Sequence, residues 1–159
     1  MSLTNAQYTT LANHIRANIE PEVVAALAIR NDTELAKLYN LDTDFYVWKT
    51  SITPDEYRSA MVWTEVDTLN AGNARIWEWV TNYFTGNLDA SDANVRQGIA
   101  DAFGAGTTTR ANLLELGKKL ASLYEEVFAT GTGTEATPGT MVLEGPVTLT
   151  QISKALNQF

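Results

Sequence analysis

Two short stretches contain residue types that could perform chemistry, and each lacks part of the pattern that its chemistry needs. Asp42-Thr43-Asp44 looks like the start of a calcium loop, but the glycine at the sixth loop position and the glutamate at the twelfth are missing. GTGTEATPGT, residues 131–140, is as glycine-rich as a phosphate-binding loop, yet no Gly-Lys-Ser or Gly-Lys-Thr follows it. Solvated loop acids explain the first stretch, and a flexible arm explains the second.

The single histidine and the acidic residues do not form a recognisable catalytic or metal-binding pattern either. His14 has no acidic residue four positions away on its predicted helix, so a zinc site would need several acids from elsewhere. Acids at predicted helix starts, such as Glu22 and Glu56, are explained by the helix dipole, and Glu125-Glu126 by solvation. We therefore predict no catalytic, cofactor-binding or metal-binding residue and no cofactor. An enzyme whose carboxylate pair is hidden among nineteen acids is the least favoured interpretation.

Composition and charge exclude several classes of protein. The 159 residues suffice for one folded domain with a core, since 45% of them are hydrophobic. The net charge of -8 opposes non-specific binding to nucleic acid or to anionic lipid. No apolar run approaches the roughly 18 residues of a membrane span, and the N-terminus has no signal-peptide pattern. We expect synthesis in the cytoplasm, no membrane binding and no sequence-specific nucleic-acid binding.

The elements that would position any functional side chain are predicted to be helices. Thr4 to Gln7 forms a capping-box pattern, and Thr53-Pro54-Asp55-Glu56 combines a hydroxyl cap, an early proline and an acid. The pattern changes at Phe45–Trp48, which we interpret as either a short strand or an extended loop. Helices are expected over about 4–17, 21–29, 31–40, 53–69, 72–84, 91–103, 108–128 and 148–159.

The predicted fold class is all-α, a helical bundle of about six to seven helices followed by an extended C-terminal arm. The longest helix is expected over 108–128, where leucines recur in steps of three and four. We predict two parts, a bundle domain over 1–128 and a linker with a docking arm over 129–159. Glycine, threonine and proline at the density seen in 129–140 favour a flexible linker. A short strand-like segment, Met141-Val142-Leu143, and a terminal helix from Thr148 follow it.

Partner binding is the function that the apolar residues favour. An apolar patch on a tether must dock either on its own bundle or on another protein. Trp77 and Trp79 lie about 200° apart around one predicted helix, so one of them should not face the core. Tryptophan is enriched at interfaces, which makes this pair a possible interface. The residues predicted to bind a partner through the arm are Met141, Val142, Leu143, Ile152, Leu156 and Phe159.

The opening MSLTNAQYTTLANHIRAN, the stretch ATGTGTEATPGT and the small apolar end resemble the small virion and neck proteins of tailed bacteriophages. In plan the chain is most similar to the head-to-tail adaptors, or connector proteins. The resemblance implies a non-enzymatic subunit that forms a ring, commonly of twelve, and binds portal and tail proteins in the virion. It also implies that DNA passes through the lumen, where negative charge would help it to slide. The family has no catalytic signature, so the resemblance assigns no residue a role.

Two alternatives remain open at this point. The chain could be another virion protein, namely a capsid-associated, tail-terminator or tail-completion protein. It could instead be a soluble helical module that uses its terminal helix to bind one partner, in which case it would be a stable monomer.

Overall fold

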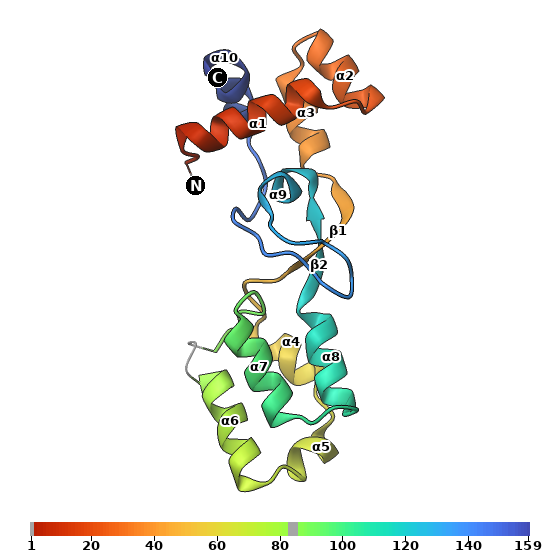
Figure 1. The fold of residues 1–159 in the computed structure, drawn as a ribbon, viewed down its shortest axis with the longest axis vertical. Coiled ribbons are helices and arrows are strands. Elements are labelled where there is room, and N and C mark those ends of the chain that lie inside the picture. The colour runs from red at the N-terminus through yellow and green to blue at the C-terminus, as the bar shows by residue number, and fades with distance from the viewer. Residues whose placement is uncertain (1, 83–85) are drawn as a thin grey trace. The chain divides into compact units, whose positions relative to one another are not determined.

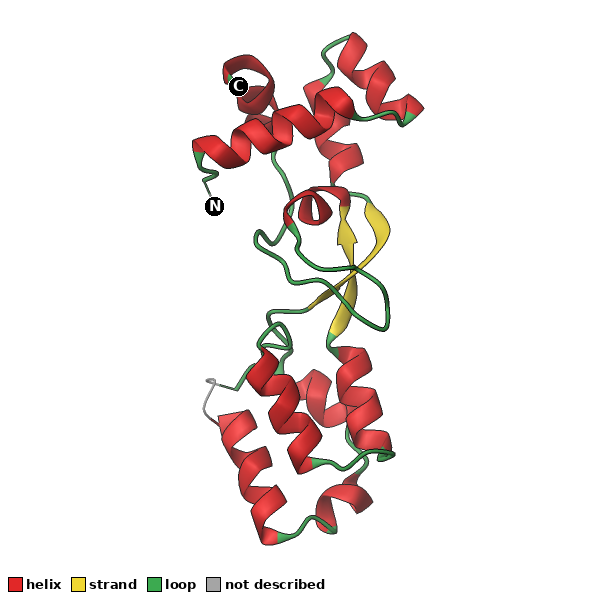
Figure 2. Ribbon diagram, viewed as in Figure 1, coloured by secondary structure: helices red, strands yellow, loops and turns green. Residues whose placement is uncertain are grey.

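The computed structural model describes residues 2–82 and 86–159, which form ten helices and two strands (Figures 1 and 2). The mostly helical character is confirmed, and the structure adds a two-stranded antiparallel sheet that the predicted all-α class did not include. The bundle arrangement stays a prediction. The elements in chain order are α1 (Asn5–Ala17), α2 (Pro21–Ala28), α3 (Asp32–Tyr39), β1 (Asp42–Trp48), α4 (Pro54–Ala60), α5 (Trp63–Asp67), α6 (Ala71–Asn82), α7 (Ala93–Ala102), α8 (Thr108–Leu116), β2 (Lys118–Ser122), α9 (Leu123–Phe128) and α10 (Leu149–Gln158).

The chain divides into two compact units, each with its own hydrophobic core. Unit 1 comprises Met1–Phe45, Leu120–Gly131 and Met141–Phe159, and unit 2 comprises Tyr46–Lys119 and Thr132–Thr140. The division therefore differs from the expected one into 1–128 and 129–159. Residues of the C-terminal segment belong to the same core as α1 and α3, rather than to a separate arm.

Four predicted helix starts are confirmed by side chains that cap the backbone, whereas the helix expected from Ser91 is capped by Asp92. Thr4, Thr53 and Thr148 each accept a hydrogen bond from the backbone N–H three residues on, and each belongs to a complete capping box. Asn31 accepts from the Glu34 N–H and begins α3. These signals are local, so neighbouring parts of the fold do not alter them.

The predicted helix over 108–128 is wrong, because the chain leaves the helical path at Gly117. α8 ends there, β2 follows, and Ser122 caps a new helix with a capping box to Glu125. The Gly117 carbonyl accepts from the Lys49 N–H (2.7 Å), and a Cβ on Gly117 would lie 2.9 Å from the Ala90 Cβ. Close packing against Ala90 therefore requires glycine at a point where glycine also weakens the helix. Phe45–Trp48, which we interpreted as either a short strand or an extended loop, is part of strand β1.

One further expected helix, over 53–69, is divided in the structure. The helix expected over 53–69 breaks between α4 and α5, where Thr109 Oγ1 accepts from the Val62 N–H (3.0 Å). Glu65 of α5 accepts hydrogen bonds from the N–H groups of Thr108 and Thr109, so its carboxylate caps α8. A hydrogen bond with the Thr109 side chain, together with these two backbone hydrogen bonds, lowers the pKa of Glu65. α6 is confirmed through Asn82, whereas Phe84, expected on the same helix, lies outside the described residues.

The expected flexible linker is fixed by hydrogen bonds to strand β1. The Tyr46 N–H donates to Gly133 O (2.7 Å), and Gly139 forms a parallel bridge with Val47. Thr134 accepts from the Thr137 N–H within the segment, and Thr132 donates to Thr137 O. Composition indicated that this segment has little apolar surface to bury. It is ordered instead by backbone pairing and by its own threonine hydroxyls.

We predict that Gly98→Ala destabilises unit 2, because Gly98 lies where α7 meets α6. A Cβ there would lie 2.5 Å from Cγ2 of the buried Val80. Overpacking of this kind costs about 1–3 kcal/mol, so after the helix-propensity gain of about 1 kcal/mol we expect a net loss of up to about 2 kcal/mol. Urea denaturation followed by tryptophan fluorescence measures the loss, since Trp48, Trp63, Trp77 and Trp79 all belong to unit 2.

Gly104→Ala is the matched control for this substitution. A Cβ at Gly104 meets no atom within 4 Å, so its free energy of unfolding should change by less than about 0.5 kcal/mol. Equal stability of the two variants would show that α6 and α7 are not packed as closely as the structure has them.

Candidate functional site

The C-terminal helix α10 is seated within unit 1 by apolar contacts. Ile152, Ala155 and Leu156 are buried on its inner face, and α10 contacts α1 and α3. Phe159 stacks on Tyr8, with ring centroids 5.4 Å apart. Each large apolar side chain buried here contributes about 1.5–3 kcal/mol, so α10 is a structural part of this core.

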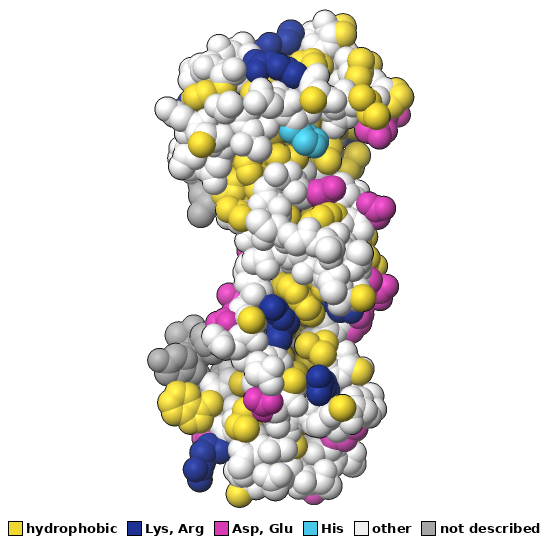
Figure 3. Space-filling view, viewed as in Figure 1, with side chains coloured by type: hydrophobic (Ala, Val, Ile, Leu, Met, Phe, Trp, Pro, Cys, Tyr) yellow, Lys and Arg dark blue, Asp and Glu magenta, His cyan; other side chains and the backbone are white. Residues whose placement is uncertain are grey.

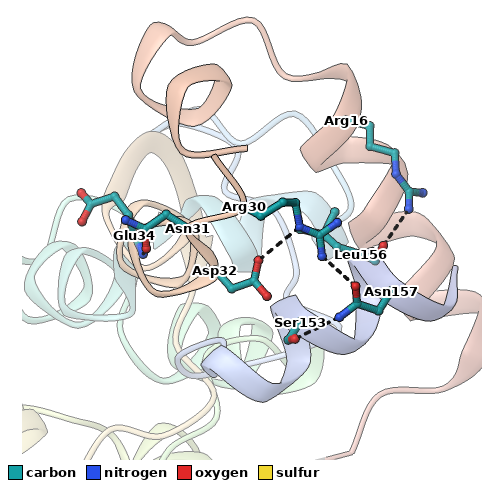
Figure 4. A network of polar contacts seen from close by, with 8 residues as sticks. All are labelled: Arg16, Arg30, Asn31, Asp32, Glu34, Ser153, Leu156 and Asn157. Atoms are coloured by element: carbon teal, nitrogen blue, oxygen red, sulfur yellow. Dashed lines mark hydrogen bonds and ion pairs between the residues drawn. The ribbon is translucent and has the colours of Figure 1, made fainter. Parts of the chain in front are cut away.

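Polar contacts fix the same helix at both of its ends. Before α10 begins, the Asn40 side chain donates to Val147 O (2.9 Å) and accepts from the Val147 N–H (2.8 Å). Near its end, Arg16 donates to Leu156 O and Arg30 donates to Asn157 Oδ1 (2.8 Å), as Figure 4 shows. These groups come from α1, from the end of α3 and from the turn that joins α2 to α3.

Arg30 connects this network to the turn between α2 and α3. Its backbone has a φ of 53°, a left-handed conformation that is uncommon for a residue other than glycine. Its guanidinium lies 3.7 Å from the Asp32 carboxylate and reaches Asn157 on α10 (Figure 4). The Arg30 side chain therefore contacts both the start of α3 and the C-terminal helix α10.

The structure brings most of the predicted arm residues into the chain's own interior. Met141, Leu143, Ile152 and Leu156 are buried, and Phe159 is half-buried against Tyr8. Val142 alone is well exposed, at 57%. The sequence left open whether this segment packs on its own chain or on another protein, and in the structure it packs on its own chain. Partner binding by the buried residues stays a prediction, and it would require α10 to leave α1.

One tryptophan of the pair is buried and the other is exposed, as their spacing predicts. Trp77 is buried and packs edge-on against Tyr57 and Phe103, whereas Trp79 is 62% exposed. Trp63, which the sequence did not single out, is similarly exposed. A role for Trp79 at an interface stays a prediction.

Helix α2 carries the clearest unpartnered apolar surface of unit 1. It buries Val23 and Ala26 but leaves Val24 exposed, together with Ile19 and Ile29 at its two ends. Ile19 and Ile29 are 86% and 75% exposed. Figure 3 shows hydrophobic side chains gathered over this helix. A helix that is apolar all round is normally buried, so α2 has the composition of a helix covered on both sides. We call Ile19, Val24, Ala25, Ala28 and Ile29 the α2 face.

The sequence contained a signal for this surface that we did not use. Residues 23–29 are seven consecutive apolar residues, so no rotation of a helix could bury all of them against one core.

A groove with acidic edges lies beside α2 within unit 1. It has a volume of about 540 Å³, and we call its apolar lining residues Val23, Leu38, Leu41 and Leu123 the floor and its acidic lining residues the edges. Glu22 contributes from α2, and Asp42 and Asp44 contribute from the start of β1. Asp42 and Asp44, which we interpreted from the sequence as solvated, therefore line a groove that also has apolar lining residues. The lining residues are Glu20, Glu22, Val23, Leu38, Leu41, Asp42, Thr43, Asp44, Leu123 and Glu126, and we call this feature the acidic groove.

Glu125, which we expected to be solvated, is buried instead. Its carboxylate accepts hydrogen bonds from the N–H groups of Ser122 and Gly145, both at 3.0 Å. It completes the capping box at the start of α9 and binds the backbone of the turn that precedes α10. Capping and burial, rather than solvation, explain this acid.

His14 is half-buried and hydrogen-bonded to Tyr39. Its Nδ1 lies 2.7 Å from the Tyr39 hydroxyl, which is fully buried. Burial lowers the pKa of His14, and the negative charge of Glu126 opposes this shift. Burial also raises the pKa of Tyr39, so its hydroxyl stays protonated and can donate to His14. The pair is a structural contact between α1 and α3.

In the part of the chain that the structure describes, no group of three or more His, Asp or Glu side chains could hold a metal ion. No helix there is long and apolar enough to cross a membrane. No protein-family model matches the chain, and neither a curated protein nor a solved structure does. The α2 face and the acidic groove are therefore the candidate functional site on their own physical evidence.

We predict that unit 1 loses stability as the pH falls below about 6.5, because His14 resists protonation in the folded state. The folded-state pKa lies below the unfolded-state value. Protons therefore bind preferentially to the unfolded chain, and the stabilisation that is complete above this pH is lost on acidification. Urea denaturation followed by circular dichroism, between about pH 8 and pH 5.5, measures the change.

His14→Gln keeps a hydrogen-bonding side chain but cannot titrate in this range. Its free energy of unfolding should vary less with pH than that of the natural chain. If the two pH profiles run parallel, His14 does not titrate as its burial implies.

Proposed function

We propose that this protein is a structural subunit of a phage-like particle, a head-to-tail adaptor that assembles as a ring and binds portal and tail proteins. The observation that carries the protein-binding part of the proposal is the α2 face. Three large aliphatic side chains, Ile19, Val24 and Ile29, stay exposed on and beside one helix. Covering them would contribute about 1.5–3 kcal/mol for each side chain that becomes fully buried, which favours association.

The route of assembly differs from the one that the sequence suggested. The C-terminal segment already fills the core of unit 1, so we assign the subunit contact to the α2 face instead. Repetition around a ring would combine many such contacts of modest strength. The more specific adaptor role and virion location come from the resemblance to phage neck proteins. The net charge of -8 supports that role, since a negative lumen repels the DNA backbone.

Substitution on the α2 face should abolish association of the intact chain. Val24→Asp/Ile29→Asp places two charges on the apolar face, and burying unpaired charges in an apolar contact is strongly unfavourable. We expect the natural chain to form oligomers as concentration rises and this variant to stay monomeric with unchanged helical content. Light scattering over a concentration series, with circular dichroism, measures both.

Val142→Asp is the control for a new surface charge elsewhere, because Val142 is comparably exposed but belongs to the C-terminal segment. It should associate like the natural chain. Loss of association in this variant alone would assign the contact to the C-terminal segment and contradict the α2 assignment. A natural chain that stays monomeric at every concentration would contradict ring formation in solution and favour the soluble binding module.

A further inference from the structure

The acidic groove offers an apolar floor that its own chain leaves uncovered. Val23 is buried and Leu123 is half-buried, but Leu41 is 53% exposed. The Leu41 backbone is held by a hydrogen bond, because its carbonyl accepts from the Leu123 N–H (2.9 Å). The exposed Leu41 side chain offers a surface on which an apolar side chain could pack.

The charges around this floor all have the same sign. Five carboxylates line the groove, contributed by the α1–α2 connection, α2, β1 and α9. No lysine or arginine is among the lining residues, and none of the five takes part in an ion pair within residues 2–82 and 86–159. Charges of one sign that line a groove with low-dielectric protein walls concentrate a negative potential in the groove. The five are Glu20, Glu22, Asp42, Asp44 and Glu126.

We propose that the acidic groove binds a basic segment of a partner protein, with one or two aliphatic side chains on the floor and lysine or arginine side chains at the edges. The floor supplies affinity through apolar burial, and the edges supply orientation and a fast association rate. The inference rests on the proposed function only in that the ligand is another protein. It adds the chemical class of the segment that binds.

The charge pattern argues against other occupants. A second copy of this chain offers only one adjacent basic pair, Lys118-Lys119, and Lys118 already forms an ion pair with Glu115 (2.9 Å). Nucleic acid would bring phosphates next to five carboxylates, which repel them. A basic and aliphatic peptide is the ligand whose charges and apolar surface both complement the groove.

The test uses the full chain and a fluorescein-labelled synthetic peptide in which pairs of leucines alternate with pairs of lysines. Fluorescence anisotropy should show saturable binding that weakens as salt rises from about 0.05 to 0.5 M. Two comparison peptides separate the contributions, one with glutamates in place of the lysines and one with serines in place of the leucines. Both should bind at least about tenfold more weakly, since each lacks one of the two complementary features.

Variants of the protein locate the binding. Asp42→Lys/Asp44→Lys reverses two exposed edge charges and should weaken peptide binding about tenfold or more, as should Leu41→Ser. Glu78→Lys/Glu135→Lys changes the net charge equally at exposed positions of unit 2, and its affinity should stay within about twofold of the natural chain. Circular dichroism establishes that each variant is folded, and Asp42→Asn/Asp44→Asn provides a milder change with the same expected direction.

Three outcomes would overturn the inference. They are an absence of binding by the leucine-lysine peptide, equal binding by the glutamate peptide, and equal loss in the edge and control variants. The result is separable from the proposed function, because assembly through the α2 face is read from light scattering without peptide. Assembly without peptide binding removes the groove inference alone, whereas peptide binding by a permanent monomer supports the groove and removes the ring.

Discussion

The fold of unit 1 depends on the return of the C-terminal segment to the N-terminal helices. Leu143, Val147 and Ile152 enter the core that α1 and α3 begin, and the Asn40 side chain satisfies both backbone groups of Val147. Without these residues, the inner faces of α1 and α3 would remain open to water. Because an exposed apolar face is costly, the last residues of the chain complete this core rather than trail from it.

This constraint decides which surfaces remain for other proteins. An amphipathic helix such as α10 can bury its apolar face once, and here it does so within its own chain. α2 cannot do the same, since it is apolar on more sides than α1 and α3 can cover. The α2 face therefore stays exposed, with the acidic groove next to it and Glu22 contributing from α2 itself. One surface would favour apolar association, and the other would select partners by charge.

Local signals made the helix starts predictable, whereas long-range packing determined the rest. Thr4, Thr53 and Thr148 act on their own first turns, so their capping boxes could be recognised from sequence. The leucine spacing over 108–128 continued through Gly117 although the chain becomes a strand there, and the Ser122 capping box that begins α9 was overlooked. Residues 132–140 are ordered by pairing with β1, which composition cannot reveal. The candidate site was missed because exposure of Ile19 and Leu41 depends on what the rest of the chain fails to cover.

Native-state hydrogen exchange on the intact chain tests the central claim, that α10 is part of the core of unit 1, most directly. The account predicts that the amides of Ile152, Ala155 and Leu156 are protected to about the same free energy as those of Leu11 and Ile15 in α1, because one cooperative unit opens together. Exchange of the α10 amides at the rate of an unfolded peptide, while α1 stays protected, would contradict it. The C-terminal helix would then be a detachable arm that is free to bind another protein.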